Sequence, residues 1–159
     1  MIRTSSPMFA CLALTLQVAL AEQALAADNE KPGVDQAVLE KQFAETMSGA
    51  TLVGQFTTVD ADGEKPLAKD RYTLGKVHKL QNGLWSFETR IQYGDHDVKV
   101  ALALKVLWAG STPVITLDKV LVPGLGTFDA RVLVHGDEYA GTWSGGDHGG
   151  HLFGTITKK

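Results

Sequence analysis

The chain has 159 residues with 15 basic and 18 acidic side chains, which give a formal net charge of −3. It contains no basic tract or stripe that could follow a phosphate backbone, so we do not expect nucleic acid as a partner. The length suits one domain with a substantial hydrophobic core.

The first 26 residues have the pattern of a secretory signal peptide. Arg3 gives a positive start, Met8–Leu20 is an apolar stretch, and Ala24-Leu25-Ala26 has the small residues of a cleavage site. The apolar stretch is shorter than the about 20 residues needed to span a membrane, although an uncleaved anchor or a core helix is an alternative. We therefore predict that residues 1–26 are removed and that the protein is exported, to the periplasm or out of the cell.

Removal of this segment would leave a mature domain without any thiol. The chain has one cysteine, Cys11, which lies early in the apolar stretch and not at its end, where a lipid-accepting cysteine would stand. Disulfides, cysteine-ligated zinc and cysteine nucleophiles are then excluded together. The remaining sequence has no second apolar stretch of spanning length, so we expect no membrane span in the mature chain.

Residues 27–49 are predicted to form a polar leader followed by one short helix. The helix covers residues 34–47, with Asp35 available as its N-cap and Gly49 as its C-terminal stop. Apolar side chains recur every four residues on one face, at Leu39, Phe43 and Met47. We expect this helix to lie over an opening or an edge of the domain.

From residue 50 onwards the hydrophobic period changes to two, which is typical of half-buried strands. The alternation is clearest in residues 85–93 and 97–108, and Asn82-Gly83 between two strands is a strong hairpin signal. The predicted strands cover residues 51–59, 71–80, 85–93, 97–108, 114–122, 128–135, 138–144 and 152–157.

Eight short strands joined by turns, with no helix between them, indicate an all-β meander over residues 50–159. Eight antiparallel strands can close into an up-and-down barrel, which removes exposed edges and leaves room for packed side chains or one small ligand. We therefore predict an all-β fold, an antiparallel eight-stranded barrel with one short N-terminal helix. A sandwich of two sheets is the competing interpretation.

Two short motifs resemble those of the calycins, the lipocalin and avidin type of small barrels. Gly54-Gln55-Phe56 follows the helix and is similar to the Gly-x-Trp opening of lipocalins, with Phe in place of Trp. Gly141-Thr142-Trp143 resembles the Gly-Thr-Trp strands of avidin-like barrels, although it lies near the other end of the chain. The resemblance covers the architecture of the mature chain. Residues 139–154 are also similar to a stretch of short secreted bacterial proteins that are themselves uncharacterised.

Large aromatic side chains lie on the apolar faces of the predicted strands. In a barrel, these faces form either a filled core or the wall of a pocket for an apolar ligand, and the two share the same inner surface. The candidate ligand-binding residues are Trp85, Phe87, Tyr93, Trp108 and Trp143.

A second candidate site is a histidine-rich turn that could hold a divalent metal such as Zn²⁺. Asp147, His148 and His151 lie in the run Gly146 to His151, and the triplet Gly-Asp-His recurs with His96. In a meander, the connections after the first, third, fifth and seventh strands share one end, so the two triplets would share a rim. Gly-Asp and Gly-Gly are also ordinary turn sequences, which is the simpler interpretation.

We expect binding more than catalysis. The serines lie in no recognisable nucleophile motif, and Gly124-Leu125-Gly126 is too short for a phosphate loop. The leading hypothesis is an exported barrel that binds a small, partly apolar molecule in its interior or mouth. The alternatives are a non-catalytic envelope or protein-interaction module and a metal-binding protein that uses the Gly-Asp-His rim.

Overall fold

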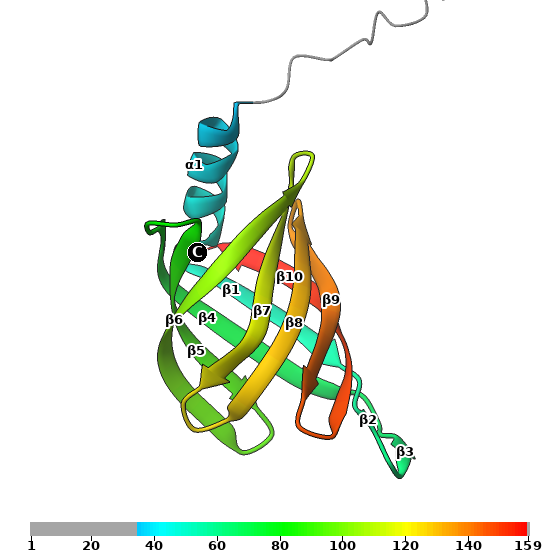
Figure 1. The fold of residues 1–159 in the computed structure, drawn as a ribbon. Coiled ribbons are helices and arrows are strands. Elements are labelled where there is room, and N and C mark those ends of the chain that lie inside the picture. The colour runs from blue at the N-terminus through cyan, green and yellow to red at the C-terminus, as the bar shows by residue number, and fades with distance from the viewer. Residues whose placement is uncertain (1–34, 159) are drawn as a thin grey trace, which may run out of the picture. The chain divides into compact units, whose positions relative to one another are not determined.

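The computed structural model describes residues 35–158, so the predicted signal peptide and the polar leader lie outside the described residues. Within this range the chain forms one helix and ten strands (Figure 1). The elements are α1 (Gln36–Met47), β1 (Ala50–Phe56), β2 (Val59–Asp60), β3 (Gly63–Glu64), β4 (Ala68–Lys79), β5 (Leu84–Tyr93), β6 (His96–Ala109), β7 (Thr112–Val122), β8 (Gly126–His135), β9 (Glu138–Gly145) and β10 (His148–Lys158).

Eight of the strands close into an antiparallel barrel. Their order around the wall is β1, β4, β5, β6, β7, β8, β9 and β10, and β1 then pairs with β10 from Ala50 opposite Lys158 to Phe56 opposite Leu152. Consecutive barrel strands are neighbours throughout, which is the up-and-down meander that the turn spacing predicts. The predicted fold class is confirmed, and the two-sheet sandwich is wrong.

Several predicted strand boundaries are wrong, among them those of the first and last strands. The first strand ends at Phe56, and Val59 belongs to the small hairpin β2–β3, which projects from the barrel between β1 and β4 (Figure 1). The last strand begins at His148, because Gly149 and Gly150 pair with β9 and do not extend the turn. Gly150 suits this position because a Cβ there would lie 2.1 Å from the Thr57 carbonyl oxygen.

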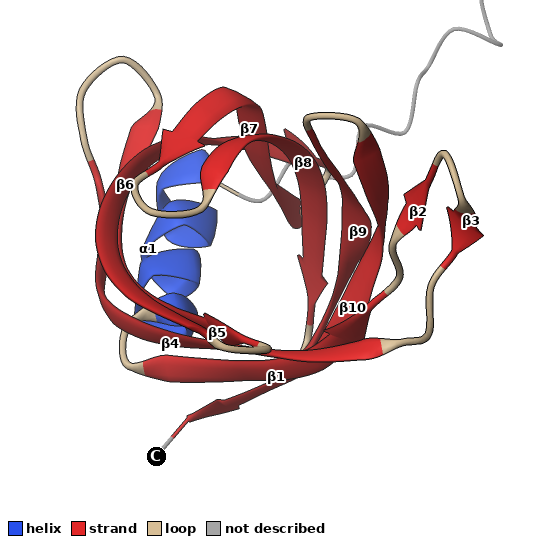
Figure 2. Ribbon diagram, turned by 90° about the horizontal axis from the view of Figure 1, so that it is seen from below, coloured by secondary structure: helices blue, strands red, loops and turns tan. Residues whose placement is uncertain are grey.

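Helix α1 forms as predicted. The Asp35 side chain accepts a hydrogen bond from the Ala37 amide at 2.9 Å, and Gly49 has a φ of +73° just after the helix. Leu39, Phe43 and Met47 are buried. The helix stands over one end of the barrel, as the view along the barrel shows (Figure 2).

The opposite end of the barrel is called the rim here and carries four connections, β1 to β4, β5 to β6, β7 to β8 and β9 to β10. It lies at the bottom of Figure 1 and faces the viewer in Figure 2. The predicted alternation on β5, β6 and β8 is confirmed, because the residues of the predicted apolar face of each strand are buried or partly buried. The barrel interior is therefore built from the faces that the period of two identifies.

Two irregularities interrupt this alternation. The register shifts between Leu74 and Val77 in β4, and again between Leu117 and Val120 in β7, where Lys119 has a φ of +50°. A bulge of this kind adds a residue to one strand and increases its local bend. In both strands, the inward-facing residues therefore have even numbers on one side of the bulge and odd numbers on the other.

Candidate functional site

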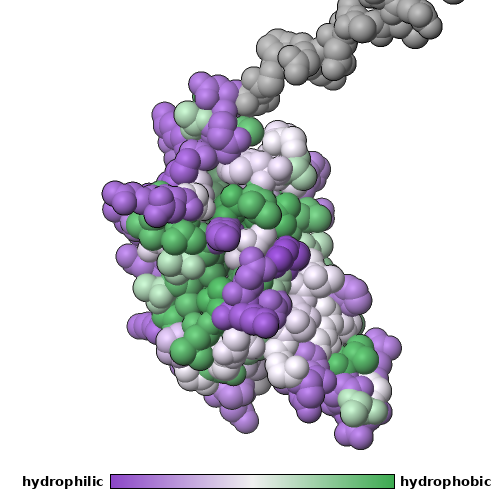
Figure 3. Space-filling model, viewed as in Figure 1, coloured by the Kyte–Doolittle hydropathy of each residue, from purple (hydrophilic) through white to green (hydrophobic). Residues whose placement is uncertain are grey.

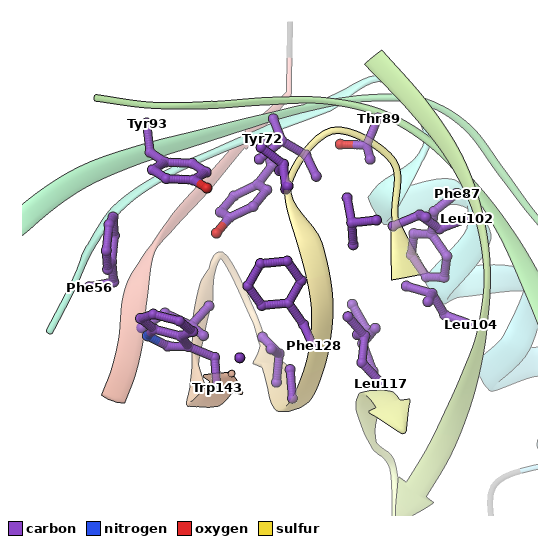
Figure 4. A pocket seen from close by; sticks show the side chains of 18 of the residues that line it. Phe56, Tyr72, Phe87, Thr89, Tyr93, Leu102, Leu104, Leu117, Phe128 and Trp143 are labelled. Atoms are coloured by element: carbon purple, nitrogen blue, oxygen red, sulfur yellow. The ribbon is translucent and has the colours of Figure 1, made fainter. Parts of the chain in front are cut away.

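The barrel encloses a cavity of about 810 Å³, which is within the range of about 300–1,000 Å³ typical of small-molecule sites. It extends from Met47 at the helix end to His96 and His148 at the rim. Figure 4 shows aromatic and aliphatic side chains that converge on it from several strands. Its wall is predominantly apolar, with representative residues Phe56, Leu102, Leu117, Phe128, Trp143 and Leu152.

Part of the wall is shaped by a tyrosine ring that lies over two glycines. Gly54 on β1 pairs with Gly154 on β10, and Gly154 also pairs with Tyr139 on β9. A Cβ on Gly54 would lie 2.2 Å from the Tyr139 Oη, and one on Gly154 would lie 2.8 Å from Tyr139 Cε1. The missing side chains let the Tyr139 ring cross β10 and β1 toward β4.

The tyrosine reaches a buried carboxyl group inside the barrel wall. Tyr139 Oη donates to Asp70 Oδ1 at 3.2 Å, and Tyr72 Oη donates to Asp70 Oδ2 at 3.0 Å. Asp70 is 3% exposed and Tyr139 is 2% exposed. These three residues are called the Asp70 cluster below. It is a polar site in an otherwise apolar interior, and both tyrosines line the cavity.

Burial dominates the ionisation of the Asp70 cluster. Loss of water raises the pKa of Asp70 above its ordinary value, although the two phenol hydrogen bonds favour its charged form. Burial and the neighbouring carboxyl group raise the pKa of Tyr72 and of Tyr139, so both phenols keep their protons. The tyrosines therefore act as fixed hydrogen-bond donors to Asp70.

The mouth of the cavity carries two histidines beside aromatic rings. The His96 ring lies 4.7 Å from that of Tyr93, and the His148 ring lies 5.4 Å from that of Trp143, measured between centroids. His148 Nδ1 is also 3.1 Å from Asp147 Oδ1, a contact that lowers the pKa of this exposed carboxyl group. The two predicted Gly-Asp-His turns thus lie at the same rim.

Only some of the predicted ligand-binding aromatics line the cavity. Phe87, Tyr93 and Trp143 do so, and their part in binding stays a prediction. Trp85 and Trp108 lie outside the cavity lining because they pack against Phe43 of α1, with ring centroids 5.1 and 6.0 Å from it. These two tryptophans hold the helix on the barrel.

The four predicted metal ligands do not come together as a set. Across residues 35–158, no group of three His, Cys, Asp or Glu side chains is placed to hold a metal ion. The two histidines of β10 stay apart because successive side chains of a strand point to opposite faces. His148 and His151 are three positions apart, so they point to opposite faces of the wall. His148 lines the cavity mouth, whereas His151 is exposed.

The Asp70 cluster is absent from the sequence-based candidates. Asp70 was expected at the end of a loop, but β4 begins at Ala68 and places Asp70 on the inner face. The sequence does contain a signal for this inner face, because Asp70, Tyr72 and Leu74 alternate with Lys69, Arg71 and Thr73. The bulge after Leu74 ends the alternation, so the signal is lost when a longer stretch of sequence is considered.

The wall also has a partly unpaired stretch. Strand β6 pairs with β5 from His96 to Lys105, but with β7 only from Lys105 opposite Thr116 to Ala109 opposite Thr112. Nearer the rim, residues 96–104 of β6 have no partner on the β7 side. The turn after β7 approaches this stretch, because a Cβ on Gly124 would lie 3.5 Å from Val98.

The outer wall has an apolar region on the same side of the molecule. Leu107 pairs with Val114, which pairs in turn with Leu133, so that one apolar row crosses β6, β7 and β8. Leu107 is 56% exposed and Leu133 is 42% exposed. Figure 3 shows apolar surface gathered over these strands.

Comparison with models of protein families, with curated proteins and with solved structures found no match to this chain. Among the described residues, the single helix is too short and too polar to cross a membrane.

Proposed function

We propose that this protein is an exported barrel that binds a small, partly apolar molecule in its interior. The observation that carries the proposal is the cavity of about 810 Å³, because solid barrels of this size are filled by their own side chains. A hollow interior leaves apolar surface without packing partners, which a ligand would supply. The signal sequence supports export to the periplasm or beyond.

We also propose a calycin-like relationship for the barrel. The meander of eight strands supports it in architecture, and the short motif Gly54-Gln55-Phe56 supports it locally. Gly54 makes room for Tyr139, and Phe56 contacts the rings of Tyr93 and Trp143 edge-on, both at 5.8 Å. The motif thus has a structural role at the level of the cavity mouth.

Native mass spectrometry of the protein from its host's exported fraction tests the proposal directly. We expect an excess of a few hundred daltons over the denatured mass, which gives the mass of the bound molecule. Equal native and denatured masses, together with no uptake of an apolar dye, would contradict ligand binding. An excess that chelator removes would indicate a metal instead.

A pair of matched variants locates the binding site. Ala130 lines the cavity, so Ala130→Phe fills part of it, whereas Ala101→Phe adds the same ring on the exposed face of β6. With the neutral dye Nile red, we expect Ala130→Phe to weaken binding by about tenfold or more and Ala101→Phe to leave it within about twofold. Equal loss in both variants would place the dye outside the barrel.

The apolar row in which Leu107 and Leu133 are exposed and Val114 is half-buried favours a second candidate function, a protein-interaction module. Exposed apolar patches on soluble proteins often mark contact surfaces. Leu107→Lys and Leu133→Lys would abolish such an interaction without an effect on Nile red uptake. A protein partner that binds the wild type but not these variants would support this candidate.

A further inference from the structure

We propose that the molecule held in the cavity is uncharged and carries a hydrogen-bond donor, such as a hydroxyl group, that the phenol oxygen of Tyr72 accepts. This inference rests on the proposed ligand-binding function and names the chemical class of the ligand. An aliphatic or polycyclic alcohol is the simplest molecule of this class.

The direction of the hydrogen bonds in the Asp70 cluster requires a donor on the ligand. Both phenol protons are committed to the carboxyl group, from Tyr72 at 3.0 Å and from Tyr139 at 3.2 Å. A phenol oxygen that donates its proton keeps lone pairs that can accept. Tyr72 lines the cavity, and its oxygen points into the open space in Figure 4. A ligand acceptor would therefore find no phenol proton free within the Asp70 cluster.

Charge complementarity disfavours a ligand carboxylate beside the Asp70 cluster. No lysine or arginine is among the residues that line the cavity, all of which belong to the described part of the chain. The buried Asp70 lies directly behind the Tyr72 oxygen. A second carboxylate there would lose its water without gaining a cation, and it would be repelled by Asp70.

A cationic ligand fits less well than a neutral one. Asp70 already accepts two phenol hydrogen bonds and does not itself line the cavity, so an ammonium group could not reach it directly. The same ammonium would be surrounded by the apolar wall, which makes its loss of water costly.

A series of ligands with one apolar body tests the inference. Dodecanol, its methyl ether, dodecanoate and dodecylamine would compete with Nile red for the full-length mature protein at neutral pH. We expect dodecanol to bind about five- to tenfold tighter than the ether, which lacks the donor, and at least about tenfold tighter than dodecanoate. Dodecanoate or dodecylamine binding as tightly as dodecanol would overturn the inference.

Two variants test whether the Asp70 cluster causes the preference for the alcohol. We expect Tyr72→Phe to bring the alcohol-to-ether ratio close to one, and Asp70→Asn to improve dodecanoate relative to dodecanol by about tenfold. Tyr93→Phe removes the phenol oxygen nearer the rim, and a collapse of the ratio only in that variant would overturn the assignment to Tyr72. If Asp70→Asn fails to fold, the wild-type ratios and Tyr72→Phe still decide.

The outcomes separate this inference from the proposed function. If neither Nile red nor any of the four ligands binds the folded protein, the ligand-binding function itself is wrong. If they bind without preference for the alcohol, the barrel binds ligands but the Asp70 cluster does not select them, and the inference alone is overturned.

Discussion

Tyr139 and Asp70 are 69 positions apart in the sequence and have two strands between them in the barrel wall, yet Tyr139 Oη donates to Asp70 Oδ1 at 3.2 Å. The tyrosine ring crosses β10 and β1 over Gly154 and Gly54, which pair with each other. Four strands are thus connected by one side chain on the inner face. This connection joins distant parts of the sequence, bears on the stability of the wall and belongs to the polar site of the cavity.

Gly54→Ala should destabilise the barrel by about 1–3 kcal/mol, the usual cost of adding a methyl group to a packed interior. The new Cβ would lie 2.2 Å from both Tyr139 Oη and the Phe153 carbonyl oxygen, so the backbone as well as the ring must move. The free energy of unfolding in urea measures the effect. Gly75→Ala is the matched control, because its nearest contact is Glu88 Oε2 at 3.0 Å, the end of a side chain that can swing away, and its contact with Glu88 Cβ at 3.1 Å is much less severe than the two at 2.2 Å. Equal losses in both variants would contradict the role of Gly54.

Asp70 should make the stability of the protein depend on pH in a characteristic direction. Burial raises the pKa of Asp70 in the folded state above the ordinary value of 3.8, so the folded state binds this proton more tightly than the unfolded state. The stabilisation is complete below 3.8 and is lost as pH rises through the folded pKa. The difference in unfolding free energy between wild type and Asp70→Asn should therefore fall as the pH rises from about 4 to 7.

Asp97 supplies a control of opposite sign. The hydrogen bond from Arg90 holds the pKa of this exposed carboxyl group below its ordinary value. Its contribution is present above 3.8 and is lost as pH falls through the lower folded pKa. Urea unfolding of Asp97→Asn should therefore show a difference from wild type that stays constant from about pH 4 to 7 and decreases only as the pH falls below 3.8. Parallel pH profiles for the two variants would rule out a specific effect of Asp70.

The predictable part of the structure follows from strong, uninterrupted patterns. Residues 85–93 and 97–108 alternate without a break, so their inner faces are evident from the sequence, and Leu39, Phe43 and Met47 identify the buried helix face. The Asp70 cluster is harder to predict because it depends on contacts between distant strands. The bulge after Leu74 shortens the pattern on β4, and the approach of Tyr139 needs the pairing of Gly54 with Gly154, which no local signal specifies.

The histidine turn shows a different source of error. Gly149 and Gly150 have the composition of a loop, but each pairs with β9, because glycine also permits close backbone approach. Once these residues belong to a strand, His148 and His151 must face opposite sides. Local composition predicted a turn, whereas pairing with β9 and contact with Thr57 determine the conformation.

Phe43→Ala should cost about 3–5 kcal/mol, as expected for a large aromatic residue removed from a core. The Phe43 ring is 4% exposed and meets the rings of Trp85, Phe87 and Trp108 edge-on. Gln42→Ala, at the exposed neighbouring position, should change stability by no more than about 0.5 kcal/mol. Thermal unfolding measured by circular dichroism compares the two. A small effect of Phe43→Ala would mean that α1 contributes little to the stability of the barrel.

Hydrogen exchange should reveal the unpaired stretch of β6. In an antiparallel strand the amide groups alternate between the two neighbours, and residues 97–104 of β6 have a partner only on the β5 side. About every second amide there should exchange faster than its sequence neighbours, by at least about tenfold, because local opening is not needed to expose it. Amides of residues 85–93 in β5, which pairs with both β4 and β6, provide the comparison within the same protein.

The pattern of protection distinguishes an open wall from a closed one. Alternating fast and slow amides in residues 97–104 would establish that β6 and β7 separate toward the rim and leave a side opening next to the cavity. Uniformly slow exchange would mean that the two strands remain paired in solution, so that a ligand could reach the interior only through the rim between His96 and His148. Addition of a tightly bound ligand should slow the fast amides if the opening serves as the access route, since a filled cavity would hold β6 and β7 together.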